Sequence, residues 1–227
     1  LYLSADREDY KSKLAGNVRQ TKKAQQDFIL LPDSTQIWIN ASSDVRYPKE
    51  FAKDKREIYL EGEVFLDVKH AEDKPFIIHL PGKISVTVLG TAFNIKAFSD
   101  REQAIVSVKR GSVKVSKGNK VLSVLTVGQE LRVNMDDNSA LVKKVAVEQI
   151  SGWQSGNLYF NDMLLKDVVK DISQQKNIEI KIENEKLAGT IINTGFNKNE
   201  TVNGILAVIK AMTDCSIKEE EGGYILY

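Results

Sequence analysis

Side chains that could support catalysis or bind a metal are few in this chain and far apart in the sequence. The two histidines, His70 and His79, are nine residues apart and show neither HExxH nor HxH spacing. The one cysteine, Cys215, follows an apolar helical pattern and cannot form an internal disulfide or a cysteine-rich metal site. Glu61 and Glu63 could serve as the acid and base of a glycosidase, but they share the polar side of one predicted strand, which favours two solvated carboxylates. The sequence therefore predicts no enzymatic activity, no cofactor and no metal site.

The segment from Glu57 to Val68 shows what kind of element carries these residues. Apolar residues and glycine alternate there with charged or amphipathic ones, which is typical of a strand with one buried and one solvated face. Similar short segments continue to about Val147, with turn residues between them and no sustained 3.6-residue period. Strands are predicted at 28–31, 35–40, 56–61, 63–68, 75–80, 83–89, 92–98, 104–109, 112–116, 120–125, 129–134 and 140–147. We expect an all-β domain, and the spacing is compatible with a sandwich, a barrel or a solenoid.

Gly90 and Thr91 interrupt this strand pattern. A glycine within such a pattern usually marks a bend or a close approach of the backbone. We therefore predict a bend here that lets the segments 83–89 and 92–98 turn across one common core.

After residue 153 the pattern changes to a mixture of strands and helices. A helix is predicted at 163–172, with Asn161-Asp162 before it as the cap. A second helix is predicted at 202–212 and can be capped by Thr201 or Asn199. Strands are predicted at 158–160, 178–182, 190–196, 216–219 and 223–227. The order β-α-β-β-α-β-β indicates a small α+β domain.

Composition and pattern together predict three parts. Residues 1–27 are polar and form a leader or linker, which is either partly helical or contains one early strand around 17–20. Residues 28–149 form the all-β domain and residues 150–227 the α+β domain. The net charge of +1 lacks the clustered basic face of a nucleic-acid-binding protein, and 42% hydrophobic residues argue against wholesale disorder. The chain starts at Leu1 rather than Met, so we expect a fragment from which a signal peptide or a membrane helix upstream could have been left out.

The order of the motifs carries a family resemblance that no one of them has alone. The motifs are Leu30-Leu31-Pro32-Asp33-Ser34, Ile37-Trp38-Ile39-Asn40, Tyr47-Pro48, the segment Arg56–Val68, Pro75-Phe76, the segment Val88–Ile95, and Arg110-Gly111 between Val106 and Val115. In this order they closely resemble the periplasmic part of the FecR family of transmembrane anti-sigma factors. The pattern from Trp153 through Leu158-Tyr159-Phe160 to Ile205 resembles the domain that follows it in Bacteroidetes members. That second domain is similar to the secretin/TonB short N-terminal (STN) signalling domain.

The resemblance implies a location and partners. The chain would be periplasmic and anchored in the inner membrane by an upstream helix. It would sense the N-terminal signalling domain of a TonB-dependent outer-membrane receptor and would reach an extracytoplasmic-function (ECF) sigma factor through an upstream cytoplasmic segment. Nucleic acid is not an expected partner. An alternative that all-β sequences also support is a cell-surface carbohydrate-binding or adhesion module.

Regulatory docking is commonly achieved by strand addition at a sheet edge, because unpaired backbone groups there offer affinity without special side chains. We hypothesise that the small C-terminal domain docks the receptor, with the strand at 190–196 as the preferred edge. The predicted partner-binding residues are Thr190, Ile191, Ile192, Asn193, Thr194, Ile178, Ile180 and Ile182. Replacing Ile192 with proline would remove a ladder donor and test this edge. The competing site is an acidic face formed by Glu57, Glu61, Glu63 and Asp67.

Overall fold

The computed structural model of the chain describes residues 16–137 and 139–227 and contains two compact units. The first unit extends to Lys22 and continues from Gln26 to Ser151, while the second contains Lys23–Gln25 and Gly152–Tyr227. Most of the predicted leader, residues 1–15, lies outside the described residues. The part of the chain that is described contains no helix long and apolar enough to cross a membrane.

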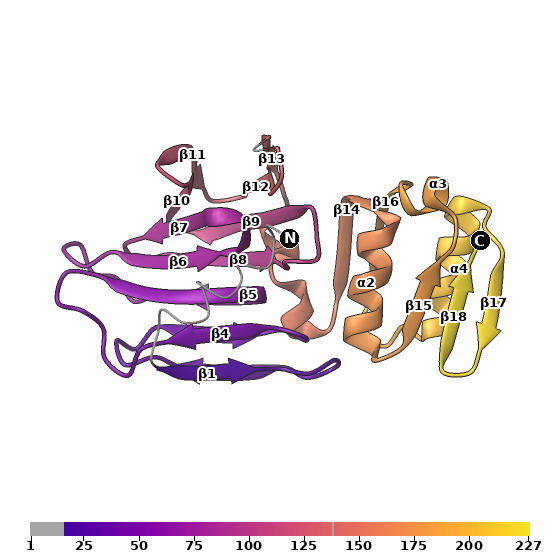
Figure 1. Cartoon of the computed structure of the whole chain (residues 1–227), viewed down its shortest axis with the longest axis horizontal. Coiled ribbons are helices and arrows are strands. Elements are labelled where there is room, and N and C mark those ends of the chain that lie inside the picture. Colours follow the sequence, from indigo (N-terminus) through magenta and orange to yellow (C-terminus); the bar gives the residue numbers. More distant parts are fainter. Residues whose placement is uncertain (1–15, 138) are drawn as a thin grey trace, which may run out of the picture. The chain divides into compact units, whose positions relative to one another are not determined.

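The first unit is built almost entirely from strands, as the alternating pattern predicts (Figure 1). Its strands are β1 (Asn17–Gln20), β2 (Asp27–Leu30), β3 (Gln36–Ile39), β4 (Asp44–Tyr47), β5 (Arg56–Asp67), β6 (Phe76–Leu80), β7 (Ile84–Val88), β8 (Ala92–Ala97), β9 (Gln103–Arg110), β10 (Ser112–Lys117), β11 (Lys120–Thr126), β12 (Gln129–Asn134) and β13 (Ala140–Lys144). Short 3-10 turns η1 (Pro81–Lys83) and η2 (Val147–Gln149) complete it.

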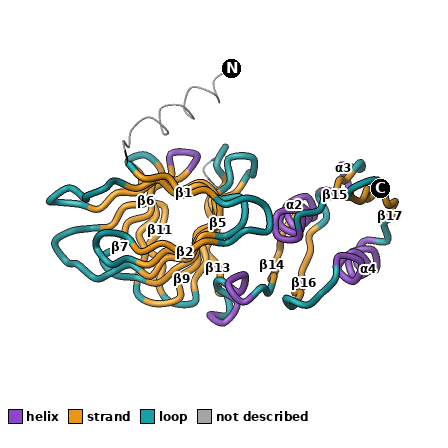
Figure 2. The backbone as a smooth tube through the Cα atoms, turned by 90° about the horizontal axis from the view of Figure 1, so that it is seen from below, coloured by secondary structure: helices purple, strands orange, loops and turns teal. Residues whose placement is uncertain are grey.

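These strands form two layers that share β5 (Figure 2). The first layer has the order β1-β4-β5-β6-β7-β10-β11, and the second has the order β2-β3-β5-β8-β9-β12-β13. All pairs are antiparallel except β5 with β6. Side chains from both layers fill one apolar core, which makes the unit sandwich-like.

Strand β5 passes from one layer to the other at Gly62. Its first half pairs with β4 and β6, and from Gly62 onward it pairs with β8. The segments predicted as two strands, 56–61 and 63–68, are therefore one strand with a change of sheet in its middle. Gly90 and Thr91 connect β7 of the first layer to β8 of the second, which confirms the predicted bend.

Two predictions at the start of this unit were wrong. The leader was assigned to 1–27, yet β1 lies inside it and pairs with β4. The predicted strand at 17–20 is confirmed, but it belongs to the sheet. Strand β4 was not predicted at all, because Ser42-Ser43-Asp44 reads as a turn. Tertiary structure overrides that reading, since β4 lies between β1 and β5 and places Val45 and Tyr47 in the core.

Arg56, at the start of β5, is the largest fully buried side chain of the first unit, with 2% of its surface exposed. Its Nη1 donates to Asp33 Oδ2 at 2.8 Å and to the Lys69 carbonyl at 2.7 Å, and its Nε donates to the Lys74 carbonyl at 2.9 Å. The guanidinium also lies 5.2 Å from the centre of the Phe76 ring. One buried cation thus joins the β2–β3 turn to the β5–β6 loop.

On the outer face of the first layer, Glu57 forms a small charged cluster. Its carboxylate lies 2.9 Å from Lys55 Nζ and 3.1 Å from His79 Nε2, and His79 stacks on Tyr59 with centroids 4.7 Å apart. Partial desolvation alone would raise the pKa of Glu57, but the hydrogen bonds from Lys55 and His79 outweigh it and hold that pKa below the usual 4.5.

Glu57→Gln should therefore destabilise the chain in a pH-dependent way. A folded-state pKa below the unfolded value stabilises the fold above the unfolded pKa, and the stabilisation is lost as pH falls through the folded pKa. We expect a loss of up to about 1 kcal/mol at pH 7 that becomes smaller at about pH 3, where more of the Glu57 carboxylate is protonated. Urea denaturation at both pH values measures it, with the exposed Glu72→Gln as control. An equal loss at both pH values would contradict this prediction.

The second unit combines two small sheets with helices (Figures 1 and 2). Its elements are η3 (Gly152–Ser155), β14 (Leu158–Leu164), α2 (Leu165–Lys176), β15 (Glu179–Ile182), α3 (Glu185–Ala188), β16 (Ile191–Phe196), α4 (Val202–Thr213), β17 (Ile217–Glu220) and β18 (Gly223–Leu226). Strand β14 pairs with β16, and the other sheet has the order β15-β18-β17. Both sheets and both long helices contribute to one apolar core.

The start of α2 differs from its prediction. The predicted cap, Asn161-Asp162, lies within β14, which continues to Leu164, and the Leu164 cap position has no side-chain hydrogen bond. The pair forms a bulge instead, because the register shifts between Phe160 and Met163. The cap of α4 is confirmed, since the Thr201 side chain accepts a hydrogen bond from the Gly204 amide. The short helix α3 was not predicted.

Candidate functional site

The candidate site is the edge of β16 that faces away from β14. Within residues 16–137 and 139–227, β16 pairs with β14 on one side and with no strand on the other. Such an edge presents a row of unpaired amide and carbonyl groups that can accept another strand.

The hydrogen-bonding directions along β16 follow from one contact. The Leu165 amide donates to the Thr190 carbonyl at 2.7 Å, so the backbone of residue 190 faces β14. Backbone groups alternate in direction along a strand, and the bulge of this pair lies on β14. The amides of Ile191, Asn193 and Gly195 therefore face the open edge, whereas that of Ile192 faces β14.

The side chains of β16 divide between core and solvent. Ile192 is 1% exposed and belongs to the core of the second unit, while Ile191 is 60% exposed. Asn193 is exposed, and Thr190 and Thr194 are half-buried. The Ile192→Pro test was thus aimed at the wrong residue, because it would break the β14 pairing and the core rather than the open edge.

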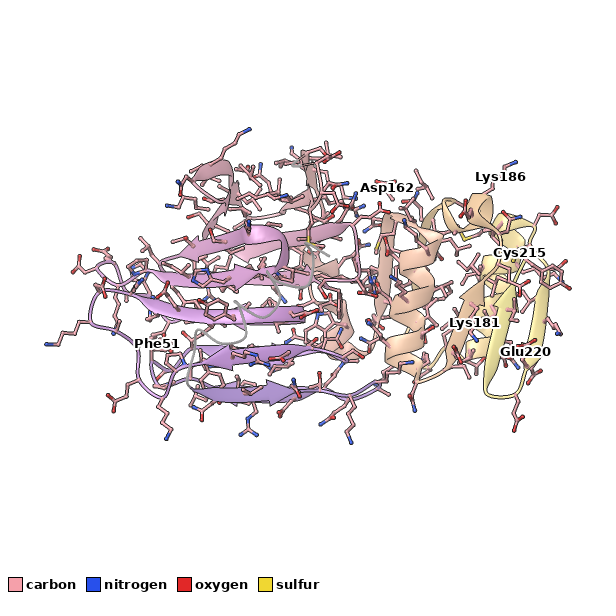
Figure 3. All side chains as sticks on the ribbon, in the orientation of Figure 1. Phe51, Asp162, Lys181, Lys186, Cys215 and Glu220 are labelled. Atoms are coloured by element: carbon pink, nitrogen blue, oxygen red, sulfur yellow. The ribbon has the colours of Figure 1, made fainter. Side chains whose placement is uncertain are left out.

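The neighbouring strand β14 supports this edge through its bulge. Asp162 has a left-handed backbone, with φ of 50°, and its amide donates to the Asn193 side chain at 2.8 Å (Figure 3). Tyr159 lies directly opposite Gly195, and a Cβ added at Gly195 would be 3.1 Å from the Tyr159 ring. The ring covers the glycine and so holds the C-terminal end of β16 against β14.

The other edges of this unit carry charges, whereas β16 does not. Lys181 on β15 lies 3.2 Å from Glu179, and Lys218 on β17 lies 2.8 Å from Glu220. The hydrogen bond between Lys218 and Glu220 lowers the pKa of Glu220 and raises that of Lys218. Charged side chains commonly protect an edge from strand addition, and residues 187–197 contain none. The edge of β16 is therefore the most suitable of these for docking.

The predicted site residues at 178–182 lie in a different sheet from those at 190–194. Ile180 is buried, and Ile178 and Ile182 are half-buried against the same core. Ile180 and Ile182 share one parity of β15, and Ile178, just before the strand, continues that parity toward the core. The side chains that β15 exposes are those of Glu179 and Lys181, not the predicted isoleucines.

The proposed acidic face is not one surface. Glu57 and Glu61 lie on β5 where it belongs to the first layer, whereas Glu63 and Asp67 lie where it belongs to the second. The carboxylates are also occupied. Glu63 accepts from Asn40 at 2.8 Å and from Asn94 at 3.1 Å, Asp67 from Arg110 at 2.6 Å, and Glu61 from Ser99. A shared docking role for these four residues is therefore not supported by their placement.

What this arrangement can do is bind another chain through its backbone. In the described part of the chain, no three or more histidine, cysteine, aspartate or glutamate residues gather as metal ligands. Sequence reasoning missed the Asp162–Asn193 contact, since Asn161-Asp162 before an apolar helical run was read as a cap. The contact between Tyr159 and Gly195 could not be predicted from their spacing in the sequence, because it depends on the register between β14 and β16.

Comparison with known proteins gives a consistent family assignment. The family description "FecR protein" matches residues 17–114, and "FecR, C-terminal" matches residues 157–227. Two crystal structures of a candidate anti-sigma factor from Parabacteroides distasonis, at 1.65 and 2.50 Å resolution, are 30% identical in sequence. Each has a TM-score of 0.87, with 93% of this chain and 98% of the other covered. A search of curated proteins found no match.

Proposed function

Because the chain belongs to the FecR family of anti-sigma factors, we propose that it is the periplasmic signalling region of such a factor. It relays substrate occupancy of a TonB-dependent outer-membrane receptor to an ECF sigma factor. The sigma factor is reached through a cytoplasmic segment upstream of an inner-membrane helix. The second unit is the STN-like part of this region.

The observation that carries the docking step is the uncharged, unpaired edge of β16. A receptor signalling domain that offers a strand would extend the β14–β16 pair by backbone hydrogen bonds. Ile191 would then contact the added strand on the solvent face of the sheet.

Asn193→Pro should weaken binding of the receptor's N-terminal signalling domain by about tenfold or more. Proline removes the amide that faces the open edge and places its ring where the added strand would lie. The measurement is isothermal titration calorimetry of the whole chain with the signalling domain of the receptor encoded beside it.

Asn193→Ala is the matched control, because it also removes the acceptor of the Asp162 amide but keeps the edge amide. Its affinity should stay within about threefold of the unchanged chain. Equal affinity of both variants would exclude the β16 edge. No binding by the folded, unchanged chain would exclude the relay itself.

The alternative, a cell-surface carbohydrate-binding or adhesion module, is not favoured by the aromatic row that the described residues form. The aromatic row on the second layer consists of Phe28, Trp38 and Phe65, with centroids 5.1 and 5.7 Å apart and both ring pairs tilted by 54°. A sugar platform needs coplanar exposed rings, and Phe65 is buried.

A further inference from the structure

The segment 103–129 is unusually one-sided in charge. It contains Lys109, Arg110, Lys114, Lys117 and Lys120 but no aspartate or glutamate. The segment begins with β9 and continues as the β10–β11 hairpin, in which β11 is the edge strand of the first layer. The two family matches stop at residue 114 and resume at 157, so β11 lies in a part of the chain that neither describes.

Three of these five cations have partners. Arg110 lies 2.6 Å from Asp67, Lys117 Nζ donates to the Met135 carbonyl at 2.5 Å, and Lys109 lies 5.4 Å from the centre of the Phe65 ring. Lys114 and Lys120 are exposed, and neither has an acidic side chain within 4.0 Å among the described residues. They leave uncompensated positive charge on the hairpin.

Exposed apolar side chains accompany this charge. Val121 and Val124 of β11 are 53% and 60% exposed. The register places Val124 directly opposite Lys114 and Val121 opposite Ser116, so both valines lie on the outer face of the first layer. Lys114 shares this outer face, whereas Lys120 pairs with Lys117 and precedes Val121, so its side chain lies on the opposite face at the end of the hairpin. A strand laid beside β11 would therefore meet apolar contacts and Lys114 on its outer face and Lys120 on its other face.

The backbone of β11 is also available on that side. Strand β11 pairs with β10, and no other described strand pairs with it. The Thr126 amide donates to Gln129 Oε1 at 2.7 Å and not to β10. Alternation then directs the Leu125 amide toward β10 and the Val124 amide toward the open edge.

We propose that the outer edge of β11 binds an extended, acidic segment of a partner protein by strand addition. The unpaired Val124 amide supplies the ladder, the two valines supply the apolar contact, and Lys114 and Lys120 select acidic side chains. The same charge repels a basic segment, which gives the edge a preference. This surface lies on the first unit and is separate from the β16 edge.

The test uses the whole chain and two synthetic peptides, one of valine-glutamate-glutamate-glutamate repeats and one of valine-lysine-lysine-lysine repeats, so that one strand face of each carries both valine and charge and the other face carries charge alone. Fluorescence anisotropy at low salt should show binding of the glutamate peptide that weakens as salt rises. The double variant Lys114→Glu/Lys120→Glu should bind it at least about tenfold more weakly. Lys49→Glu/Lys144→Glu changes the net charge equally at exposed positions elsewhere and should have little effect.

A second variant separates strand addition from simple charge attraction. Val124→Pro removes the outward amide, leaves the charges in place, and should weaken the glutamate peptide by about tenfold or more. Equal binding of both peptides, or full binding by either β11 variant, would overturn the proposal.

Two alternative ligands of the β11 edge, a membrane and a second copy of this chain, would give different experimental results. Chain that sediments with vesicles of anionic phospholipid, but does not bind the peptide, would assign the surface to a membrane. Concentration-dependent dimerisation that Val124→Pro abolishes would assign it to a second copy. Asn193→Pro should not change peptide binding, so failure here leaves the receptor proposal unaffected.

Discussion

Arg56→Met should destabilise the first unit by about 3–5 kcal/mol, the cost of breaking a buried ion pair from one side. The substitution removes the cation beside the Asp33 carboxylate, which then accepts hydrogen bonds only from Thr35 among the described residues. It also removes the arginine donor of the Lys69 and Lys74 carbonyls, in a place where the arginine is 2% exposed. Methionine has a similar length, so the loss reports on polar partners more than on an empty cavity. Urea denaturation measures it by Trp38 fluorescence, with Trp153→Phe in all the variants compared.

Arg110→Met is the matched control. Arg110 also pairs with an aspartate, Asp67 at 2.6 Å, but its side chain is 62% exposed. Exposed pairs of this kind contribute about 1 kcal/mol or less. If both substitutions destabilise the unit equally, burial does not determine the role of Arg56.

Gly62→Ala should also destabilise the first unit by several kcal/mol. Gly62 has φ of 128°, and a Cβ there would lie 2.3 Å from the Ser43 Oγ and 2.6 Å from its Cα. Strained backbone of this type costs about 1–3 kcal/mol in a residue other than glycine, and the overlap with backbone atoms adds to it. The change of layer by β5 depends on this close approach, so the same denaturation experiment should show a large shift.

Gly118→Ala separates the cost of the strained backbone from the cost of the overlap with Ser43. Gly118 also has a positive φ, of 55°, but a Cβ there would have nothing within 4 Å. Its replacement should therefore cost only the backbone term, about 1–2 kcal/mol. A Gly62→Ala variant no less stable than Gly118→Ala would show that Ser43 can move away freely.

Arg56 and Gly62 are expected to stabilise the first unit without involving the proposed docking edges. Arg56 joins loops at one end of the strands, and Gly62 lies in the middle of β5. Variants at β16 or β11 change backbone groups that face outward, so they can alter binding in a chain that remains folded. This separation makes the binding experiments interpretable.

Local pattern was sufficient for most elements. The strands predicted between residues 28 and 147 correspond to β2, β3 and β5–β13, because alternation of apolar and polar residues reflects the one-sided burial of each strand. The cap at Thr201 was also predictable, since a cap involves residues only three positions apart. The family was recognisable from the order of the motifs.

The tertiary structure decided the rest, because its determinants are far apart in sequence. Arg56 donates hydrogen bonds to Asp33 and to the Leu89 carbonyl, which are 23 and 33 residues away in the sequence. No local sequence pattern predicts partners at such separations. The acidic residues of β5 share one parity in the sequence, yet the change of layer at Gly62 divides them between two faces. Asn161-Asp162 reads as a cap locally but becomes a bulge once β14 pairs with β16. Which amides of β16 remain open depends on that same pairing, so the candidate strand could be predicted from the sequence and its outward residues could not.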